Sequence, residues 1–404
     1  MTTAAVADSP TIPDRSLRRP LALFAAIAVG LYLIVAAGNT WLPRSHDSDL
    51  QATVPAQGAL GGWLAFDSTW YVDIAANGYY YNEGQQSSVA FFPAYPLTVR
   101  ALTPATRSEA LAGILLTLAS GAAVAALFWI WVRHRLARRA AWIALGLLLL
   151  YPYAWFLYGS AYADAFFLAL VLGAFVLADR QRWLLVGIVG GLASAARPVA
   201  PAVIIGLACV ALDRSGMVRW EPPAKGGRRR IRLDRARFSA PLLWIALSAS
   251  GLVAWCAYLW SRFGDPVAFL TVQEAPGWAQ PAGPATWFKQ TFFDLIGGGH
   301  LFVLRLVPQA LVTIAFLALV PAVAKRFGWG YGAYVLVVIG IPALGTGDFQ
   351  GMGRYALAAF PVFALVGAWL AERGRSWMAP AVLTVSGVGV GVGAALFSVG
   401  FYLT

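Results

Sequence analysis

Stretches of about 20 mostly apolar residues recur along this 404-residue chain, from Leu21 to its last residues. A helical stretch of that length matches the hydrocarbon core of a bilayer. Hydrophobic types make up 59% of the chain and charged types 12%, which is about half the charged fraction of a soluble domain. The pattern therefore excludes a soluble globular enzyme and predicts an all-α polytopic membrane protein.

The apolar runs predict about 11 transmembrane helices, provided that the apolar stretch 183–212 crosses the membrane twice. Arg197-Pro198 interrupts that stretch, and two short helices fit it better than one because proline ends a helix. We expect a disordered cytoplasmic tail at 1–20, followed by one transmembrane domain at 21–404. The other expected spans are 21–38, 109–132, 140–158, 161–178, 238–260, 301–322, 329–346, 355–371 and 377–402.

Basic residues concentrate in alternate loops between these runs. Of the 30 lysine and arginine residues, 22 lie in the segments 15–19, 133–139, 180–182, 214–237, 325–326 and 373–375. The positive-inside rule assigns these segments to the cytoplasm, with a cytoplasmic N-terminus and a cytoplasmic basic loop at 213–237. The loops 39–108 and 262–300 then face the exterior of the plasma membrane. Since this topology explains most of the net charge of +12, we expect contacts with membrane lipids and none with nucleic acid.

Chemistry in the exterior loops cannot draw on cytoplasmic nucleotides, and the chain has neither a Walker A sequence nor a dinucleotide fingerprint. A donor substrate would therefore have to be linked to a lipid. Cys209 and Cys256 lie inside apolar runs, and the three histidines are scattered, so no disulfide framework and no metal site of protein ligands is expected. A divalent cation, Mg²⁺ or Mn²⁺, held between Asp67 and a lipid phosphate stays open.

Two carboxylates stand among aromatic residues in the first exterior loop. Asp67 and Asp73 are six residues apart, so on a helix they would point about 120° apart. Asp67 and Tyr71 would share one face of that helix. Asp67 is the candidate base, with Asp73, Tyr71 and Tyr79 as substrate contacts. The alternative is an interfacial helix whose acids are merely solvated.

Charged residues also lie at the exterior ends of later spans. Asp164, two residues after Tyr162, stands at the mouth of an apolar span, where an acid is costly and is a functional candidate. It could instead cap a helical hairpin. Arg197 is a lone cation in an apolar stretch, so it needs an acidic partner such as Asp164 or an anionic ligand.

Arg354, followed by Tyr355, opens the tenth span on the exterior side, against the positive-inside trend, so it calls for an anionic partner. Arg100 could be a snorkelling anchor or a phosphate ligand. Asp265-Pro266 is typical of a helix start, and it predicts a helix lying on the membrane that carries Gln273.

Taken together, these segments resemble the PIG-V family, the GPI second-mannose transferases, and their bacterial relatives. The resemblance runs from about residue 60 to 365 and rests on Phe66-Asp67, Ile74-Ala75-x-x-Gly78-Tyr79, Ala90-Phe91-Phe92-Pro93-x-x-Pro96, Ser160-Ala-Tyr162-Ala-Asp164, Ala195-Ala-Arg197, Phe263-Gly264-Asp265-Pro266-x-x-Phe269 and Arg354-Tyr355. Phe66 stands where the family usually has Trp, and Asp164 where it usually has Glu. Alanine-, arginine- and glycine-rich usage resembles that of a high-GC actinobacterium.

The resemblance implies a GT-C fold whose active site lies at the exterior membrane face. It implies inverting transfer of mannose from a polyprenyl-phosphate-mannose donor to a glycolipid or glycan acceptor, such as a mannolipid, with Asp67 as the base. The donor phosphate is expected on Arg197 and Arg354, with Arg100 a weaker candidate. The expected substrate contacts are Tyr71, Asp73, Tyr79, Tyr162, Asp164, Asp265, Gln273 and Tyr355.

Two rival functions stay open. In a flippase or transporter of lipid-linked sugars, Arg197, Arg354 and Asp164 would line a pathway. Inverted repeats would favour that function, and the sequence shows no internal repeat. In a non-catalytic subunit of an envelope-assembly complex, the same acids would only be solvated. The long exterior loop with its paired motifs favours the enzyme.

Overall fold

The computed structural model describes residues 15–45, 60–221, 230–234 and 239–403 of the chain. Its first helix, α1, begins at Arg15, so residues 15–20, expected in the tail, form the first turns of a helix instead. Residues 1–14 lie outside the described part of the chain. The two cysteines are free, as expected.

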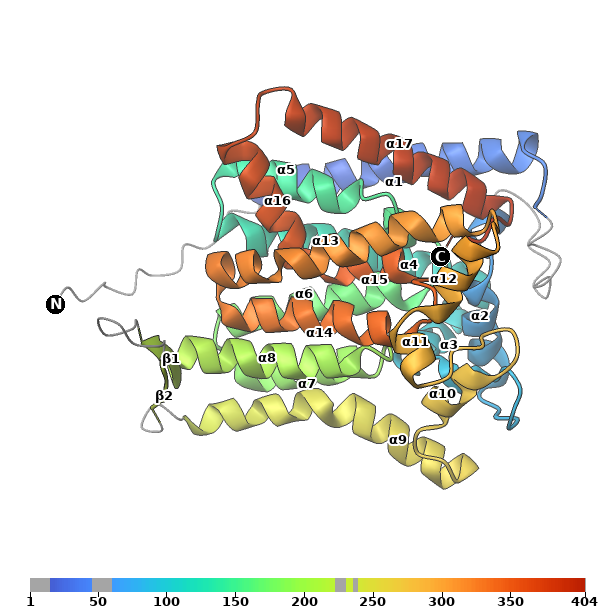
Figure 1. The fold of residues 1–404 in the computed structure, drawn as a ribbon, viewed down its shortest axis with the longest axis horizontal. Coiled ribbons are helices and arrows are strands. Elements are labelled where there is room, and N and C mark those ends of the chain that lie inside the picture. The colour runs from blue at the N-terminus through green and yellow to red at the C-terminus, as the bar shows by residue number, and fades with distance from the viewer. Residues whose placement is uncertain (1–14, 46–59, 222–229, 235–238, 404) are drawn as a thin grey trace.

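A bundle of long helices, most of them running in the same direction or its reverse, makes up the body of the molecule (Figure 1). Each of the eleven expected spans contains a helix. In chain order these are α1 (Arg15–Trp41), α4 (Glu109–Arg133), α5 (Arg138–Leu149), α6 (Ala163–Asp179), α7 (Trp183–Ser194), α8 (Ala200–Ser215), the 3₁₀ helix η6 (Ala240–Ala249) with α9 (Ser250–Phe263), α13 (Val303–Phe327), α14 (Trp329–Gly345), α16 (Phe360–Glu372) and α17 (Met378–Ser398).

Not all of these helices could cross a bilayer alone. Among the described residues, five are long and apolar enough, and a sixth span arises if the bent pair Met352–Ala358 and Phe360–Glu372 is counted as one. The stretch 183–212 forms two helices, α7 and α8, as the proline predicts. They pack against each other, so the chain reverses at the break. The fold is that of an integral membrane protein.

Glycines on α7 allow a close approach to the η6–α9 span. A Cβ added at Gly187 would overlap the carbonyl oxygen of Trp244, and one added at Gly251 would overlap that of Gly191. Backbones this close are typical of membrane helices that pack through small residues. The packing holds η6–α9 against α7 although many of its own apolar side chains are exposed.

The two ends of the bundle differ in structure. One end carries the antiparallel strands β1 (Val218–Glu221) and β2 (Arg230–Leu233), a small departure from the expected all-α fold. The other end carries short helices from the two loops expected outside (Figure 1). These are η2 (Gly61–Trp63), α2 (Asp67–Asn77), η3 (Ser88–Ala90), α3 (Ala94–Thr106), α10 (Ala268–Thr271), η7 (Val272–Glu274), α11 (Pro284–Trp287) and α12 (Gln290–Gly297), joined by η4 (Ala154–Leu157), α15 (Met352–Tyr355) and η8 (Ala356–Ala358) from the neighbouring segments.

At the end of the bundle that carries the strands, ion pairs connect helices to one another. Asp179 at the end of α6 accepts from Arg135, which follows α4, at 2.8 Å, and also pairs with Arg214 of α8. Arg135 lies over the ring of Trp131, 4.2 Å from its centroid. These contacts hold the ends of α4, α6 and α8 together, at the end where the sequence concentrates its basic residues.

Cysteines introduced at Ala105 and Ala137, in a background with both native cysteines changed to serine, should react with an impermeant thiol reagent from opposite sides of the membrane. Both positions are exposed, and they flank α4 at its two ends. The positive-inside rule predicts that Ala137 is cytoplasmic and Ala105 exterior. Labelling of both from the same side of intact cells or oriented vesicles would contradict the topology.

Candidate functional site

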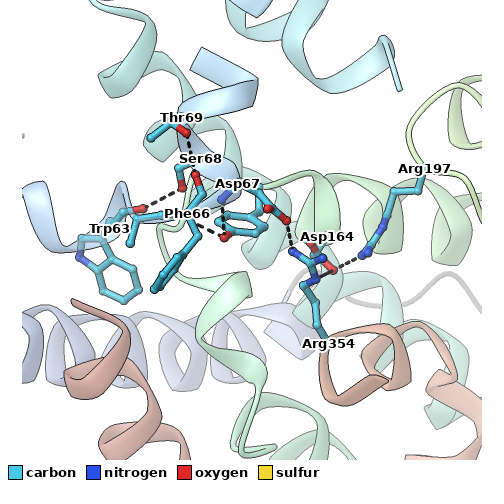
Figure 2. Close-up of polar contacts among 10 residues, drawn as sticks. Trp63, Phe66, Asp67, Ser68, Thr69, Asp164, Arg197 and Arg354 are labelled. Atoms are coloured by element: carbon cyan, nitrogen blue, oxygen red, sulfur yellow. Dashed lines mark hydrogen bonds and ion pairs between the residues drawn. The ribbon is translucent and has the colours of Figure 1, made fainter. Parts of the chain in front are cut away.

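Four charged side chains from distant parts of the chain meet at the end of the bundle that carries α2 (Figure 2). Asp67 is the first residue of α2, and Asp164 lies in the first turn of α6. Arg197 lies in the break between α7 and α8, and Arg354 lies in α15. Both acids stand at helix N-termini, where the helix dipole favours negative charge.

The four groups form a chain of ion pairs. Nη1 of Arg354 donates to Oδ2 of Asp67 at 2.8 Å. Nη1 of Arg197 donates to Oδ1 of Asp164, and Nε of Arg354 lies 3.9 Å from the same Oδ1. The sequence therefore identified residues that the fold brings together, and Asp164 is the acidic partner that Arg197 required.

Burial separates the two pairs. The side chains of Arg197 and Asp164 are 6% and 3% exposed, whereas those of Arg354 and Asp67 are 12% and 19% exposed. Removing one partner of a deeply buried pair leaves an uncompensated charge. Asp164 and Arg197 therefore form the fixed part of the network, and Asp67 and Arg354 form the part that faces solvent.

Strained backbone sets the direction of Asp67. The amide of Ser68 donates to the carbonyl of Ala65 at 3.3 Å, which closes a turn with Phe66 at φ 55° and ψ −122°. That conformation is the first central position of a type II′ turn, normally occupied by glycine. The buried ring of Phe66 packs against Phe397 and Tyr402, at centroid distances of 5.7 and 4.7 Å, and so holds the turn.

Tyr162 fixes the same turn from the other side. Its hydroxyl accepts from the amide of Asp67 at 2.9 Å and donates to the carbonyl of Ala65 at 3.3 Å. Tyr162 is fully buried, so the predicted substrate contact is in the structure a support for Asp67. Strain of this kind costs roughly 1–3 kcal/mol and persists where surrounding contacts enforce it, as it often does at functional sites.

Aromatic rings surround the two guanidinium groups. The Arg197 guanidinium carbon lies 4.6 Å from the ring centroid of Tyr355. That of Arg354 lies 5.1 Å from Tyr162, 5.5 Å from Phe156 and 5.7 Å from Tyr355. Such rings stabilise a cation while leaving N–H groups for an anionic ligand.

A cleft of about 370 Å³ opens in front of these groups. Polar and apolar groups mix along its wall, which includes four glutamines. The lining residues are Phe66, Asp67, Tyr71, Gln86, Ala90, Phe91, Arg197, Pro198, Gln273, Gly277, Trp278, Gln280, Phe302, Thr346, Gln350, Gly351, Arg354, Tyr355 and Tyr402. Of the predicted substrate contacts, Tyr71, Gln273 and Tyr355 line the cleft, and Asp164 lies behind it, paired with Arg197.

Arg100 does not reach this cleft. Its Nε donates to the carbonyl of Ala75 at 2.6 Å, and its Nη2 donates to those of Ile74 and Ala76 at 3.2 Å each. The guanidinium thus caps carbonyls in the last turn of α2, of which that of Ile74 also accepts from the amide of Gly78. In the structure Arg100 therefore holds α2 in place, and the role as a phosphate ligand is not supported.

Three other predicted contacts also lie elsewhere. Asp73 accepts from the amide of Asn77 at 2.7 Å, on a different face of α2 from Asp67. Asp265 accepts from the amide of Val267 and the hydroxyl of Thr271, both at 2.9 Å, and the expected surface helix there is only the short α10. Tyr79 donates to the carbonyl of Phe91 at 3.0 Å and lines a separate, mostly apolar pocket with Arg100.

Lys289 is a buried residue that the sequence analysis missed. Its Nζ donates to the carbonyls of Ala343 and Thr346, and lies 5.0 Å from the ring centroid of Phe349. Burial lowers the pKa of Lys289 to about 8. The contacts fix the loop between α14 and α15, which leads to Arg354. The residues around Lys289 in the sequence do not indicate this contact, because its partner Ala343 lies 54 residues further along the chain.

No three His, Cys, Asp or Glu side chains come together within the described ranges. Asp67 and Asp164 are both paired with arginines, so a divalent cation there would need oxygen ligands from a substrate. The sequence-based option of Mg²⁺ or Mn²⁺ thus stays a prediction.

Comparison with known proteins gives one result for the fold. No family model and no curated protein sequence matches the chain, so the resemblance to the PIG-V family stays a prediction. The structure is similar to the crystal structure of ArnT from Cupriavidus metallidurans bound to undecaprenyl phosphate, with a TM-score of 0.50 over 94% of this chain and 76% of that one. The fold is of the GT-C type. The two sequences are 14% identical, so the likeness concerns the GT-C fold alone.

Proposed function

We propose that this GT-C protein is a membrane glycosyltransferase that moves a mannosyl unit from a polyprenyl-phosphate-mannose donor to a hydroxyl of a glycolipid or glycan. The observation that carries the proposal is the pairing of one solvent-facing carboxylate with a guanidinium in a single cleft, backed by a second, buried guanidinium. The ArnT structure holds undecaprenyl phosphate, and a lipid phosphate suits these arginines.

The reaction needs a general base and cations that stabilise the leaving phosphate, and the cleft offers a carboxylate and two guanidinium groups for these roles. The acceptor oxygen attacks the anomeric carbon of the sugar, the bond from that carbon to the phosphate oxygen breaks, and the configuration inverts. Asp67 takes the proton of the acceptor hydroxyl as general base. The phosphate leaves with both electrons of the broken bond, and Arg354 and Arg197 stabilise its added negative charge.

The same proposal places the α2 end of the bundle at the exterior membrane face, because the basic segments lie at the other end. It favours an enzyme over a flippase, since a base held by a strained turn serves proton transfer rather than passage. Purified protein given polyprenyl-phosphate-mannose and a mannolipid should form a longer mannolipid, detectable by mass spectrometry. Absence of product with every mannosylated acceptor tried, from folded protein, would refute the proposal.

Replacing Arg354 with lysine should weaken use of the donor without unfolding the protein. Lysine keeps the charge but lacks the planar fork that grips a phosphate through two N–H groups. We expect KM for the donor to rise by about tenfold, since the loss of one good hydrogen bond to a charged group costs roughly 1.5–3 kcal/mol. Steady-state kinetics at varied donor concentration measure this. Unchanged donor kinetics would assign Arg354 to a structural ion pair instead.

A further inference from the structure

Arg354 is paired with one anion in the structure and is expected to bind a second. Its Nη1 donates to Oδ2 of Asp67 at 2.8 Å, and under the proposed function the same guanidinium holds the donor phosphate. Its Nε is buried without a hydrogen-bond partner and lies 3.9 Å from Oδ1 of Asp164. A buried N–H left unpaired costs free energy, so this guanidinium gains by turning toward an added anion.

The Asp67 carboxylate likewise has two roles, as the ion-pair partner of Arg354 and as the proposed base. A general base must present a lone pair to the hydroxyl whose proton it takes. In the structure one of its two carboxylate oxygens, Oδ2, accepts from Arg354 (Figure 2). Asp67, the proposed base, and Arg354, the proposed phosphate ligand, are therefore paired with each other before substrates bind.

We propose that the Asp67 carboxylate competes with the donor phosphate for Arg354, so that binding of the phosphate releases Asp67 to serve as the base. The inference rests on the proposed function and adds an order of events to it. The lipid-linked donor binds first, and the protein with bound donor then has both carboxylate oxygens of Asp67 free of Arg354 and able to take the acceptor proton. Without donor, an acceptor hydroxyl meets a carboxylate whose Oδ2 is already paired with Arg354.

The donor phosphate displaces a carboxylate from Arg354 and not from Arg197. Arg197 pairs with an acid that is 3% exposed, whereas the partner of Arg354 is 19% exposed and lines the cleft. A side chain at the cleft wall can be replaced by an anion from solution more readily than one behind it. Because the hydroxyl of Tyr162 holds the backbone amide of Asp67, release frees the side chain and leaves the turn in place.

Binding of undecaprenyl phosphate, which carries no sugar to transfer, tests the competition apart from catalysis. Purified protein in nanodiscs is titrated with this lipid, and the bound fraction is measured by native mass spectrometry. Asp67→Asn removes the competing charge and should bind about tenfold more tightly, since close charge pairs couple by at least about 1.5 kcal/mol. Arg354→Gln should bind more weakly than the unchanged protein.

Asp73→Asn is the matched control. It removes one negative charge from the same helix, but Asp73 contacts Asn77 and does not line the cleft. Its affinity for undecaprenyl phosphate should stay unchanged. An equal gain in both variants would indicate a general charge effect and overturn the proposal, as would unchanged or weaker binding by folded Asp67→Asn protein. Asp67→Ser, which also removes the charge, replaces Asp67→Asn if that variant does not fold.

The two proposals fail differently. If Asp67→Asn gains affinity but the unchanged protein transfers no mannose, the competition stands and the proposed function falls. If mannose is transferred and Asp67→Asn gains nothing, the function stands and the competition falls.

Discussion

Asp67→Asn should lower mannosyl transfer by roughly 10²-fold or more, the usual contribution of a positioned acid or base. Asparagine keeps the size of the side chain and can still accept from Arg354, but it cannot take a proton from the acceptor hydroxyl. The backbone turn should survive, because Phe66 and Tyr162 hold it through contacts that do not involve the Asp67 carboxylate. Initial rates at saturating donor measure the loss, and the melting temperature reports folding.

Asp73→Asn again separates position from charge. Asp73 points to another face of α2 and contacts Asn77, so its loss should be mild. Equal losses in the two variants would mean that the loop acts through its net charge. A large loss for Asp73→Asn, with Asp67→Asn still active, would mean that the base is the other carboxylate.

Asp164→Ala should destabilise the protein by about 3–5 kcal/mol, the cost of leaving one partner of a buried ion pair unpaired. Arg197 is 6% exposed, so water solvates little of its charge once the carboxylate is gone. The reduced free energy of unfolding can be followed by thermal or denaturant unfolding in detergent. Replacing both partners with apolar residues, as in Asp164→Leu with Arg197→Met, should recover much of the loss.

An exposed ion pair provides the comparison. Arg326 pairs with Glu372, and their side chains are 36% and 48% exposed, so water solvates whichever charge is left. Arg326→Ala should change the unfolding curve little. If Asp164→Ala behaved in the same way, water would reach Arg197, and the division into a fixed pair and a solvent-facing pair would be wrong.

Much of this fold follows from the sequence because bilayer thickness and proline chemistry act locally. Each expected span contains a helix, and Arg197-Pro198 marks the reversal between α7 and α8. The strands near 218–233 were not expected, since the basic residues there suggested only a loop. The span expected at 140–158 is not one helix: α5 ends at Leu149, and the short 3₁₀ segment η4 follows it.

The sequence predicted those site residues whose charge stands in a setting that disfavours it. Arg197, Arg354 and Asp164 each stand in an apolar or disfavoured setting, which signals a partner, and the structure joins them. Arg100 was the weaker phosphate candidate, and its partners are backbone carbonyls, which no residue pattern reveals. Lys289 gave no signal because its burial depends on a loop far along the chain.

The anchoring of Phe66 has a consequence for the timing of biogenesis. Asp67 and Arg354 are separated by 287 residues, and the ring that holds the strained turn rests on Phe397 and Tyr402, in and after α17. The ribosome delivers helices to the membrane in chain order, so early segments must wait for late ones. A chain whose synthesis stalls before α17 would lack the support for this turn, so its Asp67 would not be held in position.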